Sequence, residues 1–309
     1  MSEYDFVDVI RFRSQCYFNE TMYTCERIIK NGQNTLAFKT DRSDSVKCYF
    51  HDDIEAEDPR VFVVHNEVYV TFTRLSYYQT QQRCIGITKF NEWNPVCLQV
   101  ENMTKNLIEK NWTPFVKDDE LYFVYNFDPL IIIKYDFNPN GMCNVVFRQN
   151  DCTLPIDTSQ TYLRGGTNML QFKDEYYICA CHSRIIDTCF RYYTHIVLID
   201  TKKWQIVYLS KPVLFCYPLM NKPALNCYNT QTRKRTRKPL DTIGNTTILI
   251  DKSPHIIQFP TSLYKHDSEY FLTLNVRDAV SLLYVVSFSK RLWNCDNTNT
   301  NNNDKTCVG

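Results

Sequence analysis

The chain has 309 residues, of which 44% are hydrophobic, and its formal net charge at pH 7 is +1. This apolar content excludes a disordered chain, and the near-neutral charge excludes a strong general attraction to nucleic acid or to a membrane surface. The 21 tyrosines and 19 phenylalanines, against only 7 glycines, are typical of half-buried strands.

The sequence shows neither a membrane span nor an export signal. No stretch reaches the roughly 18 consecutive apolar residues of a transmembrane helix. The N-terminal segment MSEYDFVDVIRFRSQ lacks a basic start followed by an apolar block. We therefore expect a cytoplasmic protein with no membrane partner, whose 14 cysteines are reduced thiols rather than disulfides.

Four segments repeat one design along the chain: an apolar run, a short polar turn with an acidic residue, and an aromatic strand. They are Val61–Thr73, Pro114–Phe127, Met169–Ser183 and Ser262–Val276. Each pattern predicts a β-hairpin. The markers of the repeat are Glu67, Glu120, Glu175 and Glu269. They are separated by about 53, 55 and 94 residues, and the first two steps are close to the spacing of propeller blades.

Further strands are predicted after these hairpins, which gives each repeat the four strands of a propeller blade. The long last step leaves room for a degenerate copy near Phe215–Tyr228, and about fifty residues precede the first marked hairpin. We predict an all-β protein: a five-bladed β-propeller with four-stranded antiparallel blades over 1–293, followed by a disordered Asn-rich tail over 294–309. A β-sandwich is the structural alternative, but its strands would not repeat at this period.

Charged and amide side chains recur just before each hairpin and at the end of its second strand. The segments before the hairpins contain EDPR, EKNWTP, RGGT and IIQFPT, in that order. In an antiparallel hairpin these two positions lie at the same rim, and propeller blades bring equivalent rims together around one axis. We therefore predict one axial pocket. The predicted site residues are Glu57, Asp58, Arg60, Arg74, Lys110, Asn111, Trp112, Asp128, Arg164, His182, Gln258, Asn275 and Asp278.

These motifs also resemble those of a known group of enzymes. The series EDPR, EKNWTPF, LRGGT and IIQFPTSL, followed by Asn275-Val276-Arg277-Asp278, is similar to the five-bladed glycosidase and glycoside-phosphorylase superfamily. Within it, the chain resembles the β-mannoside phosphorylases and related β-mannosyltransferases of bacteria, protists and large viruses. The resemblance runs from about Glu57 to Asp278. The last motif departs from the pattern, because relatives usually carry a glycine-containing turn there.

The resemblance implies roles for five residues. Asp58 corresponds to the general acid, and Arg60, Lys110, Arg164 and His182 correspond in place to residues that grip sugar hydroxyls or phosphate. We therefore expect an inverting glycoside phosphorylase or glycosyltransferase for a mannose-type sugar. Its partners would be an oligosaccharide or sugar phosphate, with no nucleic acid and no cofactor beyond phosphate or sugar phosphate as co-substrate.

Two other functions stay open. A phosphate nucleophile is already ionised, whereas a hydrolase needs a second carboxylate roughly 6.5–9.5 Å from the acid to activate water. Glu57, Asp128 and Asp278 are the candidates for that second role. A glycoside hydrolase of the same fold is therefore one alternative, and a non-catalytic carbohydrate-binding propeller is the other.

Several residues also have a purely structural interpretation. Trp112 is a candidate for packing under its blade, and the glycine pair at 165–166 would supply a tight turn. Cys179 and Cys181 alternate onto one strand face beside His182, but no C-x-x-C motif is present, so we predict no metal site. The basic run RKRTRK, Arg233–Lys238, is predicted to be a solvated loop away from the site.

Overall fold

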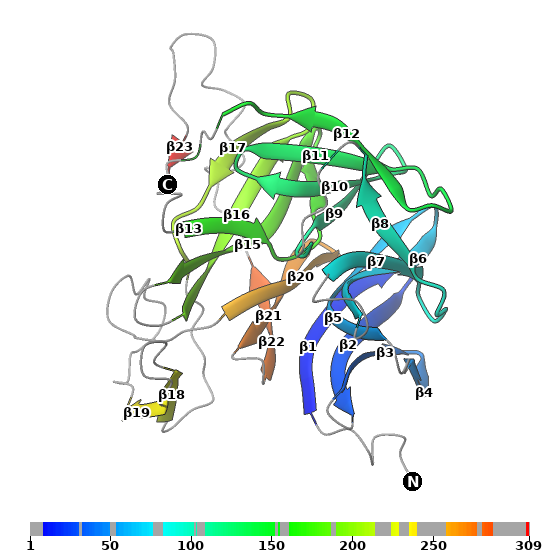
Figure 1. Ribbon diagram of the computed structural model, residues 1–309, viewed down its shortest axis with the longest axis vertical. Helices are drawn as coiled ribbons and strands as arrows, with labels where there is room; N and C mark the ends of the chain where they lie inside the picture. Colours follow the sequence, from blue (N-terminus) through cyan, green and yellow to red (C-terminus); the bar gives the residue numbers. More distant parts are fainter. Residues whose placement is uncertain are drawn as a thin grey trace.

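The computed structural model of the chain is all-β, as the sequence predicts (Figure 1). The structure describes residues 9–30, 33–49, 54–76, 83–101, 103, 109–151, 154, 161–186, 190–213, 224–228, 235–239, 258–276, 280–286 and 307–308. Within these ranges, no helix has the length and apolar character needed to cross a membrane. Most strands form five antiparallel units that follow one another along the chain, and we number the units in that order.

The first three units have four strands each, joined as meanders. The first contains β1 (Val9–Phe18), β2 (Thr21–Lys30), β3 (Gln33–Thr40) and β4 (Ser43–Tyr49). The second contains β5 (Ile54–Val64), β6 (Glu67–Ser76), β7 (Arg83–Lys89) and β8 (Val96–Val100). The third contains β9 (Thr113–Lys117), β10 (Glu120–Phe127), β11 (Leu130–Tyr135) and β12 (Met142–Arg148).

The remaining units are less regular. The fourth contains β13 (Thr161–Gly165), β14 (Leu170–Lys173), β15 (Tyr176–Ile186), β16 (Phe190–Asp200) and β17 (Gln205–Leu209), and both β13 and β14 pair with β15. The fifth contains β20 (Gln258–His266), β21 (Glu269–Val276) and β22 (Val280–Val286). A separate two-stranded sheet contains β18 (Ala224–Tyr228) and β19 (Arg235–Pro239). Of the predicted tail, the structure describes only β23 (Cys307–Val308), which pairs with β17.

All four predicted hairpins are present, as β5–β6, β9–β10, β14–β15 and β20–β21. Two of their turns consist of consecutive non-glycine residues with positive φ. His65 and Asn66 have φ of 52° and 55°, and Asp118 and Asp119 have φ of 53° and 59°. Two left-handed residues in succession make a tight hairpin turn that matches the twist of the strands, and Asn and Asp tolerate this conformation better than most residues. The glycine-poor chain therefore turns on Asn and Asp.

The position of one repeat differs from the sequence prediction. Asn19 and Glu20, with φ of 48° and 57°, form the same turn between β1 and β2, so the residues before the first marked hairpin are a full unit. The degenerate copy proposed near Phe215–Tyr228 is therefore not needed to reach five. Residues 214–223 lie outside the described part of the chain, and β18 pairs with β19 rather than with a unit. Of the basic run, residues 235–238 form part of strand β19 rather than a loop, and residues 233–234 are not described.

The second and third units are joined edge to edge, unlike separate four-stranded blades. β8 and β12 pair in parallel at Gln99–Met142 and Val100–Cys143, which gives one eight-stranded sheet. Gly141, with φ of 70°, allows this approach, because a Cβ atom at this position would collide with the carbonyl oxygen of Cys97. The amide of Gln99 donates to the carbonyl of Gly141 at 2.8 Å.

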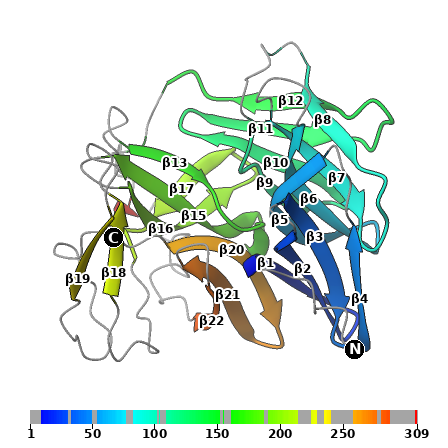
Figure 2. The same cartoon turned by 60° about the horizontal axis from the view of Figure 1, so that its bottom comes forward.

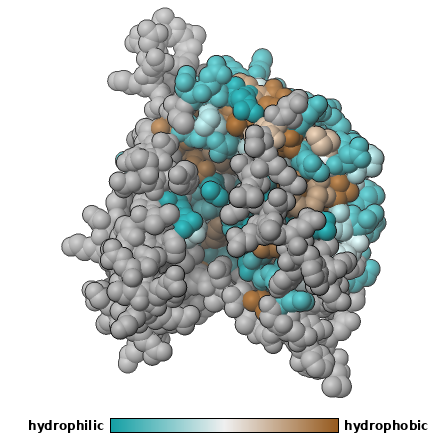
Figure 3. All heavy atoms as spheres, in the orientation of Figure 1, coloured by the Kyte–Doolittle hydropathy of each residue, from teal (hydrophilic) through white to brown (hydrophobic). Residues whose placement is uncertain are grey.

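The five units contact one another in a ring (Figure 2). β1 contacts β5, β5 contacts β9, β10 contacts β13, β15 contacts β20, and β20 returns to β1. The first and the fifth units are therefore neighbours. On the face shown in Figure 3, the described surface is mostly hydrophilic with scattered hydrophobic residues.

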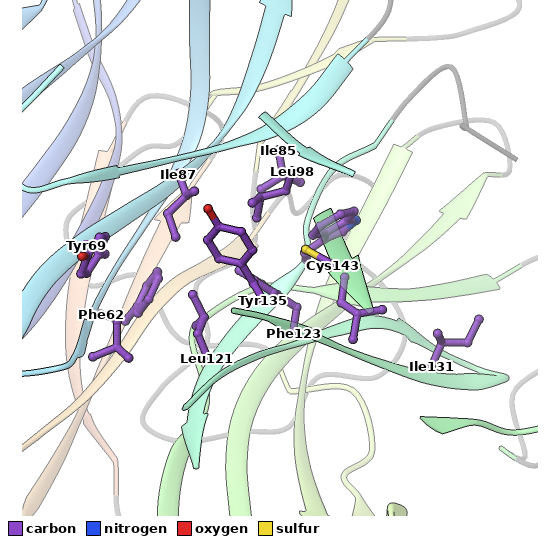
Figure 4. Packing of buried hydrophobic residues seen from close by; sticks show 13 residues of the cluster. Phe62, Tyr69, Ile85, Ile87, Leu98, Leu121, Phe123, Ile131, Tyr135 and Cys143 are labelled. Atoms are coloured by element: carbon purple, nitrogen blue, oxygen red, sulfur yellow. The ribbon is translucent and has the colours of Figure 1, made fainter. Parts of the chain in front are cut away.

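Hydrophobic clusters fill four of the five boundaries, or seams, between neighbouring units. The cluster between the second and third units includes Phe62, Tyr69, Leu121 and Phe123 (Figure 4). Other clusters join the third unit to the fourth, the first to the second, and the fourth to the fifth. Among the described residues, the seam between the first and fifth units has no such cluster.

Candidate functional site

The EDPR motif forms a bulge in β5. The pairing register moves from Glu57, opposite Thr73, to Arg60, opposite Thr71, and Asp58 has a positive φ of 52°. Arg60 stabilises this backbone shape, because its Nη1 donates to the carbonyl oxygens of Asp58 and Pro59, both at 2.9 Å. A bulge re-aims the side chain of the extra residue. The sequence therefore places Asp58 where the strand departs from regular pairing.

Both carboxylates of the motif contact arginines. Arg27, on β2 of the first unit, lies with Nη2 3.1 Å from Glu57 Oε1 and Nη1 3.6 Å from Asp58 Oδ1. Arg83 Nη1 is 3.8 Å from the other Glu57 oxygen, Oε2. Arg27 was not among the residues predicted from the sequence, because its segment precedes the four recognised repeats and contains none of their motifs.

The four basic residues predicted to share a pocket do lie close together. His182 is only 2% exposed. Burial is the largest cause that holds the pKa of His182 well below its usual range, and the positive charges of Arg60, Arg164 and Lys110 act in the same direction. A hydrogen bond to the backbone of Gly165 acts in the opposite direction. The imidazole is therefore neutral at pH 7, within reach of three cations.

Two aromatic rings hold the buried part of this cluster. Arg60 is 3% exposed, and its guanidinium carbon lies 5.0 Å from the ring centre of Phe12 and 5.5 Å from that of Phe259. The His182 ring centre is 4.2 Å from that of Phe259. Burial lowers the pKa of Arg60 to about 10, against the opposing effect of Asp58, so the guanidinium keeps its charge at pH 7. Residues of the first, second, fourth and fifth units thus meet at Phe259.

Several buried polar atoms around this cluster have no hydrogen-bond partner among the described residues. They are Arg60 Nη2, His182 Nδ1, Asn111 Oδ1 and Thr113 Oγ1. Buried polar groups are nearly always hydrogen-bonded, so such atoms point to a water molecule, an ion or a ligand. Arg60 Nη2 and Thr113 Oγ1 can donate to an anion, which the cationic environment also favours, whereas Asn111 Oδ1 only accepts and suits a hydroxyl group or water.

The glycine pair before the third hairpin allows close packing and does not form a left-handed turn. Neither glycine has a positive φ. A Cβ atom on Gly165 would collide with the carbonyl oxygen of Asn111 and with Thr113 Oγ1, and one on Gly166 would collide with Ala180 and Pro260. Gly165 therefore lets the fourth unit approach the start of β9 in the third unit, and Gly166 lets it approach Pro260 of the fifth.

Trp112 is part of the core, in agreement with its packing interpretation. Its ring is 4% exposed and lies 5.7 Å from that of Phe123 and 5.3 Å from that of Tyr125. Its Nε1 donates to Glu109 Oε2 at 3.1 Å, and Tyr125 Oη donates to Glu109 Oε1 at 2.8 Å. The indole is therefore a support for the half-buried Glu109 carboxylate, and we do not assign it to substrate binding.

The other residues predicted for the site lie in several parts of the fold. Asp128 lies in the turn between β10 and β11 and is half-buried. Arg74 Nη1 lies 3.5 Å from the sulfur of Cys97. Gln258 and Asn275 are buried beside Phe259, where Asn275 is its partner across the β20–β21 pair. Asp278 lies outside the described residues.

The two cysteines near His182 are buried in one apolar cluster, as strand alternation predicts. The sulfur atoms of Cys179 and Cys181 lie 3.5 Å apart, and burial raises the pKa of the Cys181 thiol well above its usual value. Within the described ranges, no three His, Cys, Asp or Glu side chains have an arrangement that could hold a metal ion.

Comparison with known sequences finds a partial similarity to β-mannosyltransferases. The profile of a family described as "Beta-mannosyltransferases" matches residues 78–189, a range that includes Lys110, Arg164 and His182 but neither Asp58 nor Arg60. β-Mannosyltransferase 3 of Candida albicans is 30% identical over 189 residues, which is 52% of this chain and 34% of that protein. β-Mannosyltransferase 1 of Komagataella phaffii is 27% identical over 130 residues, 37% of this chain and 19% of that protein. The matches thus span about a third or less of these relatives.

Comparison with solved structures shows a shared fold. The structure of a GDP-mannose-dependent mannosyltransferase from Leishmania mexicana matches with a TM-score of 0.56 and 12% identity, over 98% of this chain and 91% of that one. The Listeria innocua β-1,2-mannobiose phosphorylase, solved with β-1,2-mannobiose, matches with a TM-score of 0.56 and 10% identity, over 94% and 92%. A glycosyl hydrolase from Bacteroides ovatus matches with a TM-score of 0.58 and 9% identity, over 90% and 84%.

Proposed function

We propose that this chain is a carbohydrate-active enzyme for a mannose-type sugar. It transfers the sugar from an oligosaccharide to phosphate, or from a sugar phosphate to an acceptor. The ring of five antiparallel units supports a five-bladed β-propeller, with the reaction in its axial pocket. The similarity to β-mannosyltransferases supports the mannose-type sugar. The matched solved structures include one mannosyltransferase and one phosphorylase, which is why both directions of transfer are included.

The observation that carries this proposal is the cationic cluster around His182. The pKa of the buried imidazole is lowered by its burial and by three nearby positive charges, those of Arg60, Arg164 and Lys110. Arg60 and His182 each also have a buried nitrogen without a partner among the described residues. Like charges gathered at one site repel each other unless an anion lies between them. Phosphate, with its several acceptor oxygens, suits this arrangement and needs no further cofactor.

Asp58 is the acid of the proposed reaction. In phosphorolysis its proton moves to the glycosidic oxygen as the bond from that oxygen to the anomeric carbon breaks, and a phosphate oxygen bonds to the anomeric carbon from the opposite face. The products are a sugar phosphate of inverted configuration and a shortened oligosaccharide. In the reverse direction the acceptor hydroxyl gives its proton to Asp58 while phosphate leaves.

The contacts of Glu57 favour phosphate over water as the nucleophile. An inverting hydrolase needs a second carboxylate that is able to take a proton from water. Both Glu57 oxygens already contact arginines, Arg27 and Arg83. Hydrolysis would therefore rely on another carboxylate such as Asp128 or Asp278.

An assay of phosphate exchange tests the proposal. The protein is incubated with mannose 1-phosphate and a panel of mannose-type acceptors, and the release of phosphate is measured; the reverse reaction uses β-mannosides and phosphate. In a parallel series GDP-mannose replaces mannose 1-phosphate, and the release of GDP is measured instead. We expect phosphate release that depends on the acceptor. Sugar release that is unaffected by phosphate would instead identify a hydrolase, and binding without turnover in any series would identify a carbohydrate-binding protein.

Replacement of the acid, Asp58→Asn, should lower kcat by about 10²–10⁴-fold while the protein stays folded, because a positioned general acid typically contributes this much. Steady-state kinetics and a thermal melt measure the two effects. Asp174→Asn is the matched control, since Asp174 also has a positive φ of 47° but is an exposed turn residue. Turnover near that of the wild type in Asp58→Asn would eliminate this assignment.

A further inference from the structure

We propose that Arg27 is a positioning residue for the reaction: it fixes Glu57 as an anchor and leaves Asp58 as the carboxylate that reacts. This inference rests on the proposed function. The first unit carries none of the site residues predicted from the sequence, and this inference gives it a role in the reaction.

Glu57 is held on both sides. Its Oε1 lies 3.1 Å from Arg27 Nη2 and its Oε2 lies 3.8 Å from Arg83 Nη1. Its side chain is 14% exposed. Its Oε1 accepts a hydrogen bond from Arg27, and its Oε2 stays within ion-pair distance of Arg83, so this carboxylate has little freedom to rotate towards a substrate. We therefore assign Glu57 an anchoring function and not the substrate contact predicted from the sequence.

Asp58 is held on one side only. Its Oδ1 is 3.6 Å from Arg27 Nη1, which is too long for a hydrogen bond, and no described residue donates to its Oδ2. The bulge and the positive φ at this position turn its side chain away from the regular strand direction. The contact with Arg27 therefore orients the carboxylate without saturating it, as a group that exchanges a proton with substrate requires.

Arg27 is itself fixed before any substrate arrives. Its Nε donates to Asn34 Oδ1 at 2.8 Å, and Asn34 Nδ2 donates to Glu55 Oε2 at 2.7 Å. These contacts join β2, β3 and β5, and the Arg27 side chain is only 13% exposed. A guanidinium held in this way presents its two terminal nitrogens to Glu57 and Asp58 in a set geometry. Lysine, with a single flexible ammonium, does not reproduce it.

The predicted kinetic effect follows from this division. We call the contacts of Arg27 with Glu57 and Asp58 the clamp. Its removal should displace Asp58 but leave the cations at His182 in place, so phosphate binding should persist while the chemical step slows. A misplacement of about 1 Å can cost about 10²-fold in rate. We expect kcat to fall by about 10–100-fold in Arg27→Met, with the KM for phosphate changed less than about threefold. Arg27→Lys should have an intermediate kcat, and Asn34→Ala a smaller loss of kcat in the same direction.

Two control variants separate positioning from stability. Arg13→Met removes an arginine from the same unit whose Nη2 lies 2.6 Å from the buried Glu26, and Arg42→Met removes an arginine from an exposed pair with Glu20. Both should keep the wild-type kcat in their folded fraction, and Arg13→Met reports the effect of lost stability alone. A similar loss of kcat in Arg13→Met and Arg27→Met would overturn the positioning role.

The outcomes also distinguish this inference from the proposed function. If Asp58→Asn is inactive and Arg27→Met is fully active, the Arg27 inference fails and the proposed function stands. If Asp58→Asn is as active as the wild type, Asp58 is not the acid; the proposed function itself fails only if no series of the exchange assay shows turnover. Amide hydrogen exchange at Arg60 and Val61 then tests the clamp without any turnover. Faster exchange there in Arg27→Met than in Arg13→Met supports the clamp, and equal exchange overturns it.

Discussion

The seam between the second and third units and the seam between the first and fifth units are built from different chemistry. The first contains an apolar cluster with Phe62, Leu121 and Phe123 at its centre. The second lies on the face of β1 that carries Tyr17, whose ring centre is 4.1 Å from that of His266 in the fifth unit. Strand alternation places Arg13 and its partner Glu26 on this face, where the fully buried Glu26 lies with Oε1 2.6 Å from Arg13 and 3.0 Å from Lys39. Apolar packing is tolerant of small shifts, whereas a buried carboxylate is stable only while its cations stay in place.

The polar seam extends to the fifth unit. Ser262 and Thr273 alternate with Leu263 and Leu272, which pack towards the fourth unit, so the two hydroxyl groups face the first unit. Both hydroxyls, and Glu26 Oε2, are buried without a partner among the described residues. Such atoms imply ordered water in the seam. The comparison teaches that the boundary at which the chain closes its ring depends on exact polar geometry, whereas the others depend on apolar area.

The largest expected effect is in the apolar seam. Phe123→Ala should lower the free energy of unfolding by about 3–5 kcal/mol, because truncation of a fully buried phenylalanine loses apolar burial and leaves a cavity. Urea unfolding measures it. Val146→Ala, at an exposed position on β12, is the control and should change the free energy by less than about 0.5 kcal/mol. A loss below about 1 kcal/mol in Phe123→Ala would show that this cluster does not carry the seam.

The polar seam should respond differently to single and combined changes. Glu26→Gln should cost about 1–3 kcal/mol of unfolding free energy, less than a fully buried pair, because the side chains of Arg13 and Lys39 are 35% and 31% exposed. The combined Arg13→Met, Glu26→Leu and Lys39→Met variant should be as stable as the wild type or more stable, because no charge is then left without a partner. Urea unfolding compares the variants. A triple variant less stable than Glu26→Gln would contradict this account of the seam.

The smallest effect is the dependence of stability on pH at His182, whose ring packs on Phe259 of the fifth unit. Its pKa in the folded protein is well below 6.5, mainly through burial, so below about pH 6.5 the unfolded chain binds more protons than the folded one. Stability should therefore fall as pH falls through this range, by at most about 1.4 kcal/mol per pH unit for this one group.

The variant His182→Gln tests this prediction, with urea midpoints measured between pH 7.5 and pH 5. The slope should become shallower in His182→Gln, and the buried His195, whose pKa is also lowered chiefly by burial, should account for part of what remains. An unchanged slope in His182→Gln would mean that folding does not lower the pKa of His182.

The sequence predicts the hairpins well because their signal is local. The turns at His65-Asn66 and Asp118-Asp119 lie between apolar or aromatic runs, and the structure has hairpins at both. The turn at Asn19-Glu20 has the same form, between Cys16-Tyr17-Phe18 and Thr21-Met22-Tyr23, so the first unit was open to prediction. The edge pairing of β8 with β12 could not be predicted, because contacts between units leave no local pattern in the sequence.

The site divides in the same way. Arg60, Lys110 and Arg164 precede three of the hairpins, and His182 ends the second strand of the third. Because these two positions lie at one rim, the meeting of the three cations around the buried imidazole could be predicted from strand geometry. Phe12, Phe259 and Arg27 hold this site through contacts between units far apart in the sequence. Trp112 was predicted as a site residue but packs in the core. An aromatic residue beside polar ones gives the same sequence pattern in both cases.

The parallel bridge between β8 and β12 has a consequence for solubility. An unpaired outer strand offers a row of free backbone groups to which another chain can add a strand, the first step of aggregation. By pairing with each other at Gln99–Met142 and Val100–Cys143, the two outer strands hide part of both rows at once. Gly141 permits this pairing, because a Cβ atom there would collide with Cys97. A side chain at this position should therefore separate β8 from β12 and leave both strands with unpaired edges that can bind another chain.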